Sequence, residues 1–336
     1  MKAINIGING LGRIGRTLFR LLDNHPHINV VAINDLADAR TLAHLLKYDS
    51  IHGVFQQNID HDENHIIYNN TAIPVCNKNT PKDIDWSSFN IDVVIESTGK
   101  FKSSSLLNHH LKNGAKKVML TVPPEDDDIK MIVYGINHSQ LTAQDHILSN
   151  ASCTTNNAAP MIKVINDLCG VEQAYITTVH SYTSDQSLHD QPHRDLRRSR
   201  AAAQSIIPTT TGAARALTKI FPELSNVIGG CGIRVPVPNG SLTDITFNVK
   251  KETSIQEIND TFEEKSRKEL KNVLFCTKDP IVSIDVNNSS YSCTFDSQMT
   301  SVIGKMVKII GWYDNETGYC SRIIDTLNLL IDKKYI

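Results

Sequence analysis

Long hydrophobic runs, paired cysteines and an excess of charge of either sign are all missing from this sequence of 336 residues. No apolar run approaches the length of a membrane span, and the N-terminus has no signal-peptide pattern, so we expect a cytoplasmic protein without a membrane partner. The seven cysteines include no Cys-x-x-Cys and no Cys/His pairing, which argues against a disulfide framework and against a metal site. A formal net charge of −2 gives no reason to expect nucleic acid as a partner.

The sequence does contain a regular alternation of strand-like and helix-like segments in its first half. This rhythm predicts a doubly wound, mostly parallel sheet of the Rossmann type. The expected strands are 2–9, 28–33, 91–96, 117–121 and 131–136, and the expected helices are 16–22, 38–48 and 104–112.

A glycine-rich turn follows the first expected strand. Gly10, Gly12 and Gly15 form a GxGxxG pattern between a strand and a helix, which is the context that a dinucleotide-binding turn requires. Asp35 ends the next strand, 20 residues after Gly15, where a carboxylate can reach a ribose. That carboxylate would accept from a 2′-hydroxyl and repel a 2′-phosphate, so NAD is favoured over NADP. The alternatives are a turn-forming glycine cluster and a solvent-facing aspartate.

A polar turn of small residues, 149–156, places Cys153 at or near the start of an expected helix. Unpaired amides and the helix dipole at such a position favour an anion, and they lower the pKa of a thiol from about 8.5. The alternative is a small buried cysteine without a chemical role. His180, at the end of the β-rich segment 175–179, is the candidate base, although a structural histidine would look the same.

The second half is richer in expected strands, which predicts an α+β domain with a mixed or antiparallel sheet. We expect a dinucleotide-binding domain at 1–152 and a catalytic domain at 153–316, with a C-terminal helix, 317–336, packing back on the first. The expected elements after 179 are strands at 233–237, 242–250, 281–286, 291–295 and 306–313, and helices at 254–270 and 317–331.

Two polar stretches in this half are candidate anion sites. The excursion 181–203 is long and rich in arginine, so it is either a solvated loop or a wall for a phosphate-bearing ligand or a subunit contact. The stretch 207–214 offers hydroxyls and a glycine amide before a helix, which suits phosphate but also suits a simple helix cap.

Seven blocks of sequence, in order along the chain, resemble the phosphorylating glyceraldehyde-3-phosphate dehydrogenase family. They are residues 9–16, 43–50, 149–156, 180–183, 207–212, 234–239 and 312–316. The resemblance implies an NAD-dependent homotetramer of glycolysis or gluconeogenesis. It further implies that Cys153 attacks the aldehyde of glyceraldehyde 3-phosphate, that His180 acts as base, and that inorganic phosphate releases 1,3-bisphosphoglycerate from a thioester.

The same resemblance assigns roles at matching positions. Cofactor contacts are implied for Gly10, Gly12, Arg13, Ile14, Gly15, Asp35, Thr121 and Asn315. The substrate's own phosphate is assigned to Thr183 and Arg234, with Asp185 holding that arginine. The attacking phosphate is assigned to Ser152, Thr154, Arg198, Thr211 and Gly212.

Three positions depart from the family's pattern. Asn157 stands where a second cysteine is usual, Asn79 replaces an adenine-site arginine, and Gln191 replaces a leucine common in NAD-specific members, which leaves some NADP use open. Two other functions share part of this pattern. Erythrose-4-phosphate dehydrogenase is similar but lacks the residues equivalent to Thr183, Thr211 and Gly212, and a non-catalytic NAD-binding protein would not need Cys153 and His180.

Overall fold

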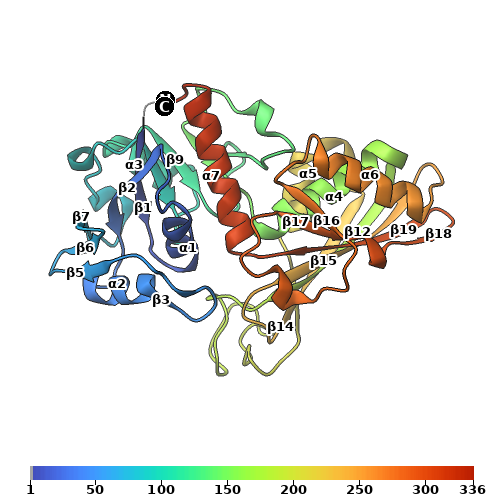
Figure 1. Cartoon of the computed structure of the whole chain (residues 1–336), viewed down its shortest axis with the longest axis horizontal. Coiled ribbons are helices and arrows are strands. Elements are labelled where there is room, and N and C mark those ends of the chain that lie inside the picture. Colours follow the sequence, from blue (N-terminus) through green and yellow to red (C-terminus); the bar gives the residue numbers. More distant parts are fainter. Residues whose placement is uncertain (1–2) are drawn as a thin grey trace. The chain divides into compact units, whose positions relative to one another are not determined.

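A computed structural model describes residues 3–336 and divides the chain into two compact units (Figure 1). Unit 1 comprises the described residues up to Ile132, together with His138–Ala151 and Cys320–Ile336. Unit 2 comprises Val133–Asn137 and Ser152–Tyr319. Residue 2 of the first expected strand lies outside the described residues.

Unit 1 is built on a six-stranded sheet in the order β10-β11-β9-β8-β1-β2, in which every neighbouring pair is parallel. Its strands are β1 (Ile4–Asn9), β2 (Ile28–Asn34), β8 (Val93–Glu96), β9 (Lys117–Leu120), β10 (Lys130–Met131) and β11 (Ile147–Ser149). Its helices are α1 (Arg13–Leu21), α2 (Ala39–Lys47) and α3 (Ser104–Lys112).

The central strands of this sheet are buried on both faces. Ile6 and Ile8 of β1 and the apolar residues of β8 are fully buried, which is typical of a parallel sheet covered by helices on both sides. The chain leaves β1 toward β2 and later resumes on the opposite side of β1 with β8. The strand order therefore reverses between β1 and β8, where doubly wound sheets bind ligands at their carboxyl ends.

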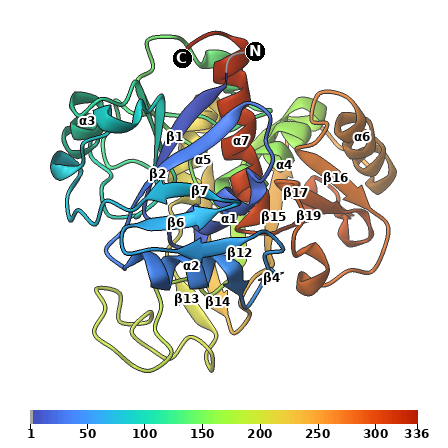
Figure 2. The ribbon, with the colours of Figure 1, turned by 60° about the vertical axis from the view of Figure 1, so that its left-hand side comes forward.

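Two small antiparallel sheets are added to unit 1 beyond the expected elements. One pairs β3 (Tyr48–Asp49) with β4 (Gly53–Val54), and the other contains β5 (Ile59–His61), β6 (His65–Tyr68) and β7 (Thr71–Pro74). Figure 2 shows β6 and β7 near β2, and an isolated bridge joins Ile33 to Val75.

Unit 2 contains a mixed sheet in the order β13-β14-β12-β15-β19-β17-β16, with β18 added to β19. β12 runs parallel to β14 and antiparallel to β15, and β19 is antiparallel to β15. The strands are β12 (Val171–Ser181), β13 (Ile207–Thr209), β14 (Ile228–Val235), β15 (Ser241–Val249), β16 (Leu274–Thr277), β17 (Cys293–Asp296), β18 (Ser301–Ile303) and β19 (Met306–Tyr313).

Helix α4 (Cys153–Cys169) packs on this sheet, against β12, β15, β17 and β19. It also contacts α5 (Ala213–Ile220) and α6 (Ile255–Arg267), and Figure 1 shows the three helices together along the sheet. Because α4 is covered on several sides, most of its residues are buried, including Met161 and Ile162. The last helix, α7 (Thr317–Asp332), begins directly after β19.

The predicted fold class is confirmed: a Rossmann-type parallel sheet is combined with an α+β unit whose sheet is mixed. Two expected strands are wrong. Residues 283–286 form a short 3-10 helix, and of the expected strand 131–136 only Met131 pairs in a sheet, as the second residue of β10. At the second place the side chain of Asn137 accepts a hydrogen bond from the buried Val133 amide at 2.7 Å, which stabilises a turn where the apolar run suggests a strand.

Over residues 3–336, helices that combine the length and the hydropathy needed to cross a membrane are not found.

Candidate active site

The glycine turn of unit 1 packs so closely that two of its glycines are required. Gly10 has φ +95°, and a Cβ there would lie 2.8 Å from the Thr98 amide nitrogen. A Cβ on Gly15 would lie 2.3 Å from the Gly10 carbonyl oxygen. Gly12 has no atom within 4 Å of such a Cβ, so this side of the turn is open to a ligand. Helix α1 begins at Arg13, directly after Gly12, so the N-terminus of a helix adjoins the same opening.

Asp35 lies against this turn at the end of β2. One carboxylate oxygen accepts from the Leu11 amide at 2.7 Å, and the other accepts from the Ala37 amide at 3.1 Å. A cavity opens here, at the carboxyl ends of β1, β2 and β8. Its lining residues are Asn9, Gly10, Gly12, Asn34, Asp35, Leu36, Lys78, Asn79, Ser97, Thr98, Lys100 and Phe101. Asn79, which stands where the family pattern has an arginine, is therefore part of the lining.

The side chains of two other residues expected to contact the cofactor, Arg13 and Thr121, form hydrogen bonds within the protein. The Arg13 guanidinium holds Asp49 through hydrogen bonds of 2.5 and 3.1 Å. Desolvation would raise the pKa of Asp49, but this contact and the amides of the following turn hold it well below its usual range. Thr121 follows β9 and donates its hydroxyl to the Glu96 carbonyl oxygen at 3.1 Å, and it does not line the cavity.

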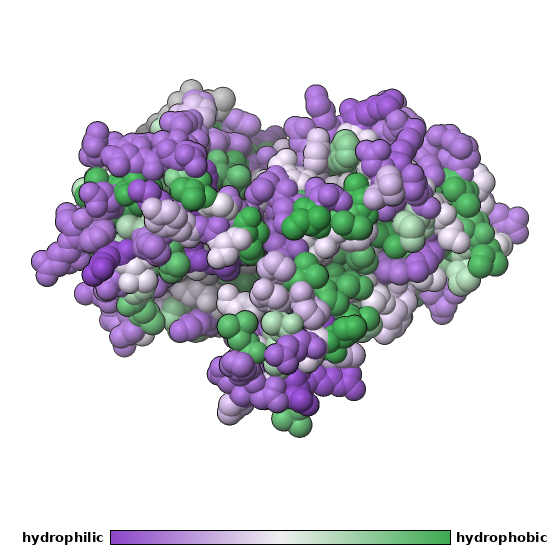
Figure 3. Space-filling model, turned by 60° about the horizontal axis from the view of Figure 1, so that its bottom comes forward, coloured by the Kyte–Doolittle hydropathy of each residue, from purple (hydrophilic) through white to green (hydrophobic). Residues whose placement is uncertain are grey.

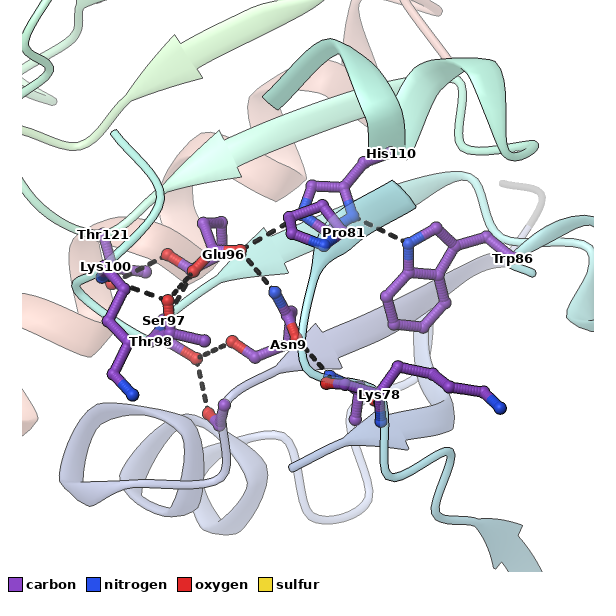
Figure 4. Close-up of polar contacts among 12 residues, drawn as sticks. Asn9, Lys78, Pro81, Trp86, Glu96, Ser97, Thr98, Lys100, His110 and Thr121 are labelled. Atoms are coloured by element: carbon purple, nitrogen blue, oxygen red, sulfur yellow. Dashed lines mark hydrogen bonds and ion pairs between the residues drawn. The ribbon is translucent and has the colours of Figure 1, made fainter. Parts of the chain in front are cut away.

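Beneath the cavity lies a buried carboxylate, Glu96, that no sequence motif predicts. Glu96 is fully buried, and Figure 4 shows it among Asn9, Thr98 and His110. It accepts from Asn9 Nδ2 at 2.5 Å, from the Thr98 amide at 3.0 Å and from the Thr98 hydroxyl at 2.5 Å, and it lies 3.1 Å from His110 Nε2. Trp86 donates to His110 Nδ1 at 2.8 Å, so the proton of a neutral His110 sits on Nε2 and points at Glu96. One feature of the sequence could have indicated this buried carboxylate: Glu96 is the charged last residue of an otherwise apolar strand.

In unit 2, Cys153 is the first residue of α4, as the sequence predicts. Ser152 caps the helix by accepting from the Thr155 amide at 3.1 Å. Ala151, just before the cap, is buried and adopts φ +55°, a left-handed conformation unusual for alanine. The cysteine Sγ lies 3.4 Å from Nε2 of His180, the last residue but one of β12. The expected nucleophile and base are therefore neighbours in the fold, 27 residues apart in sequence.

The electrostatics of this pair differ from the expectation for a helix start. Desolvation raises the pKa of the Cys153 thiol, although the charge of Arg234 and the amide of Thr154 oppose that rise. Burial, with the positive charges of Arg234 and Arg198 added to it, lowers the pKa of His180 to about 3. Both shifts act against the charged forms, the thiolate and the imidazolium.

Asp185 acts on Arg234 through its charge, but its direct partner among the described residues is a different arginine from the one expected. Arg234 donates from Nη1 to the Ser181 carbonyl oxygen at 2.8 Å and lies 2.7 Å from His180 Nδ1. Asp185 instead accepts from Nη1 of Arg198 at 2.6 Å. Both residues of that ion pair lie in the excursion 181–203, so Asp185 pairs with an arginine 13 residues away in the same segment.

Arg198 also connects the excursion to the second polar stretch. Its Nε donates to the Thr209 hydroxyl at 3.0 Å, and its Nη2 donates to the Thr210 carbonyl oxygen at 3.3 Å. The following residues, Thr211 and Gly212, precede α5, and the Thr211 hydroxyl accepts from the Ala213 amide at 3.2 Å. The structure therefore places Arg198 in contact with the segment that holds Thr211 and Gly212, the residues assigned with it to the attacking phosphate.

Two serine hydroxyls determine the orientation of the Asn315 amide. Ser181 and Ser241 both donate to its Oδ1, at 2.8 and 3.0 Å. The Nδ2 group of Asn315 is therefore left as a donor of fixed direction. Neither serine was predicted as a site residue, because their role depends on strands that are distant in sequence.

Tyr313 is a buried residue that contacts both the residue after Cys153 and the ring of His180. Its hydroxyl lies 2.9 Å from the Thr154 hydroxyl and 3.0 Å from that of Thr178, and its ring meets His180 edge-on with centroids 6.0 Å apart. The Thr154 hydroxyl is thus already used within the protein. Among the described residues, no group of three or more His, Cys, Asp or Glu side chains is placed to hold a metal ion.

Comparison with known proteins gives one consistent result. Residues 4–104 match the model of the glyceraldehyde 3-phosphate dehydrogenase NAD binding domain, and residues 152–315 match that of the C-terminal domain. The chain is 47% identical over 330 residues to glyceraldehyde-3-phosphate dehydrogenase 1 of Bacillus cereus, covering 98% of each chain. It is 46% identical to the enzyme of Geobacillus stearothermophilus, covering 98% of this chain and 99% of that one. With that of Thermotoga maritima it shares 47% identity over 97% of this chain and 98% of the relative. The chain belongs to the glyceraldehyde-3-phosphate dehydrogenase family.

Proposed function

We propose that this protein is an NAD-dependent, phosphorylating glyceraldehyde-3-phosphate dehydrogenase. The single observation that carries the proposal is the contact of 3.4 Å between Cys153 Sγ and His180 Nε2 at the start of α4. A thiol beside an imidazole, at a helix N-terminus, suits covalent catalysis at a carbonyl carbon.

In the proposed reaction the Cys153 sulfur attacks the aldehyde carbon while His180 Nε2 takes the thiol proton. The amides at the start of α4 offer hydrogen bonds to the oxyanion of the thiohemiacetal. Removal of a hydride from that carbon leaves a thioester on Cys153. Inorganic phosphate then attacks the thioester and releases the acyl phosphate, and the sulfur departs as a thiolate.

NAD, when bound, supplies the hydride acceptor for the oxidation. The residues present fit such a group: Gly12 is open on the ligand side, and Asp35 places a carboxylate in the same cavity. We further propose that Asn315 holds the nicotinamide carboxamide, because its Nδ2 is left as a directed donor. Arg13 and Ile14 would contribute backbone amides, since the Arg13 side chain is held by Asp49.

Two anion sites are proposed for the two phosphate groups. The substrate's own phosphate is assigned to Thr183 and Arg234. Attacking phosphate is assigned to Ser152, Thr154, Arg198, Thr211 and Gly212. Arg198 and the 209–212 segment are in contact, which supports this grouping.

We also propose that the enzyme is a cytoplasmic homotetramer. Several large apolar side chains on unit 2 are exposed in the single chain, and Figure 3 shows hydrophobic surface among hydrophilic surface there. Leu188 and Leu196 of the excursion are 67% and 81% exposed, which suits a subunit contact.

Steady-state rates with glyceraldehyde 3-phosphate and with erythrose 4-phosphate, each with and without inorganic phosphate, test the proposal. We expect a preference for the former and a requirement for phosphate. Efficient turnover of erythrose 4-phosphate without phosphate dependence would instead identify the alternative dehydrogenase. A parallel comparison of NAD with NADP tests the consequence of Gln191.

A further inference from the structure

Three hydrogen bonds hold the Arg198 guanidinium and leave part of it free. Its Nη1 donates to Asp185 at 2.6 Å, its Nε donates to the Thr209 hydroxyl at 3.0 Å, and its Nη2 donates to the Thr210 carbonyl oxygen at 3.3 Å. A guanidinium has five N–H donors, so these bonds leave one N–H on Nη1 and one on Nη2 for an anion.

A second carboxylate acts on Arg198 through the Thr209 hydroxyl. Thr209 has a single hydroxyl hydrogen, which it donates to Asp195 Oδ2 at 2.7 Å. The lone pairs of the hydroxyl are therefore left to accept from Arg198 Nε, which lies 3.8 Å from the same Asp195 oxygen. The Thr209 hydroxyl, and after it the Arg197 amide, lower the pKa of Asp195, so this carboxylate is charged at neutral pH.

Both residues that support Arg198 in this way are themselves fixed by the backbone. Asp195 Oδ1 accepts from the Arg197 amide at 2.9 Å, which holds the carboxylate in its turn. Thr209 is the last residue of β13, which pairs with β14 in the sheet of unit 2. An arginine side chain has several rotatable bonds, so a contact with a sheet strand removes conformations that it would otherwise adopt.

The charge of Arg198 also acts on the proposed catalytic base. Burial is the main cause of the lowered pKa of His180, and the positive charges of Arg234 and Arg198 add to it. The Arg198 guanidinium therefore lies near the reacting atoms, where an anion held by its free N–H groups is close to an acyl group on Cys153.

We propose that Asp195 and Thr209 are positioning residues for the attacking phosphate, because they hold Arg198 with two N–H groups free. This rests on the proposed function, in which Arg198 binds that phosphate. In the reaction a phosphate oxygen bonds to the thioester carbon while the carbon–sulfur bond breaks, and the sulfur keeps the electron pair. A guanidinium that is already ordered brings the phosphate to this carbon without a further loss of side-chain freedom.

Charge alone predicts the opposite effect for Asp195. Its carboxylate repels a phosphate dianion, so its removal would improve phosphate binding if electrostatics decided the outcome. Removal of a positioning group instead impairs the use of phosphate, because Arg198 loses its fixed orientation. The two explanations therefore differ in the sign of one measurable quantity, kcat/KM for phosphate.

The test separates the two halves of the reaction in Asp195→Asn. Without phosphate the proposed reaction stops at the thioester, so each active site forms one NADH in a burst whose rate reports acylation. At saturating glyceraldehyde 3-phosphate and NAD, kcat/KM for phosphate reports attack on the thioester. We expect kcat/KM for phosphate to fall about tenfold in this variant while the burst rate stays near wild type.

Matched variants separate the hydroxyl from the charge. Thr209→Val removes the hydroxyl and should reproduce the loss, whereas Thr209→Ser keeps the hydroxyl and should restore kcat/KM for phosphate. Asp190→Asn is the control for charge, because Asp190 accepts from Arg200 Nε at 2.8 Å and from the Ala201 amide at 3.0 Å in the same excursion. This control should leave kcat/KM for phosphate unchanged.

An unchanged or raised kcat/KM for phosphate in Asp195→Asn would overturn the positioning role and leave the proposed function intact. An equal loss in the burst rate would also overturn it, because Asp195 would then support the whole site. If Asp195→Asn does not fold, the Thr209 variants decide, and equal values for Thr209→Val and Thr209→Ser would contradict the inference. Wild-type turnover that needs no phosphate would instead refute the proposed function itself.

Discussion

Replacing Glu96 by glutamine tests whether the buried carboxylate organises the cofactor cavity. Glu96 accepts from Asn9, from both donors of Thr98 and from His110, so all of its neighbours donate. A glutamine at this position must turn its NH2 group toward some of these donors. If the NH2 group faces Asn9 and His110, it meets two other N–H donors. Neither can turn an acceptor toward it, because Asn9 Oδ1 already accepts from Asn34 and His110 Nδ1 already accepts from Trp86.

The less costly orientation points the new NH2 group at Thr98. The Thr98 hydroxyl can rotate to accept, but its amide loses a partner, and hydrogen bonds to a charged acceptor contribute about 1.5–3 kcal/mol each. The remaining bonds also change from a charged to a neutral acceptor. We therefore expect Glu96→Gln to lower the free energy of unfolding by roughly 2–4 kcal/mol.

The expected assay combines a urea unfolding midpoint with steady-state kinetics. Asn9 and Thr98 both line the cavity, so KM for NAD should rise several-fold while kcat changes little. Asp92→Asn is the matched control. Asp92 accepts from the Asn5 amide and from Lys116 at the opposite end of β1 and β8, so this variant should lose less stability and keep KM for NAD. A Glu96→Gln protein with wild-type unfolding midpoint and wild-type KM for NAD would refute the reasoning.

Three further outcomes are expected. Cys153→Ser should abolish dehydrogenase turnover while NAD binding, followed by fluorescence titration, stays near wild type; retained turnover would contradict covalent catalysis. Gly15→Ala should destabilise the protein by about 1–3 kcal/mol and weaken NAD binding, because its Cβ would lie 2.3 Å from the Gly10 carbonyl oxygen; a gain in thermal midpoint would show that the turn relaxes. Asn157→Ala should cost about 1–3 kcal/mol in urea unfolding, since its amide donates to the carbonyl oxygen of Ser292 at 3.2 Å; an unchanged midpoint would mean that this bond contributes little.

The features that the sequence predicts well are those that depend on neighbours along the chain. The helix expected at 104–112 is observed as Ser104–Lys112, because its start, periodicity and end are all local. The glycine turn is equally local, since the close contact of Gly15 is with Gly10. Cys153 at the start of α4 follows from a capping serine directly before it.

The features that the sequence does not predict depend on which distant elements meet. Glu96 and His110 come together because β8 and α3 pack in one unit, and no spacing in the sequence encodes that contact. The partner of Asp185 was assigned by resemblance and proved to be Arg198. Motifs therefore identify which residues contribute chemistry, but the hydrogen-bond partners that set their protonation require coordinates.

The protonation of Cys153 shows why this distinction matters for mechanism. A helix start alone predicts a lowered thiol pKa, yet desolvation raises it, and burial together with the charge of Arg234 lowers the pKa of the neighbouring imidazole. Covalent attack on an aldehyde requires the thiolate, so burial of the sulfur works against the step that Cys153 is proposed to perform. The contact of 3.4 Å between Cys153 Sγ and His180 Nε2 opposes the cost of desolvation, because transfer of the thiol proton to the imidazole places two opposite charges side by side.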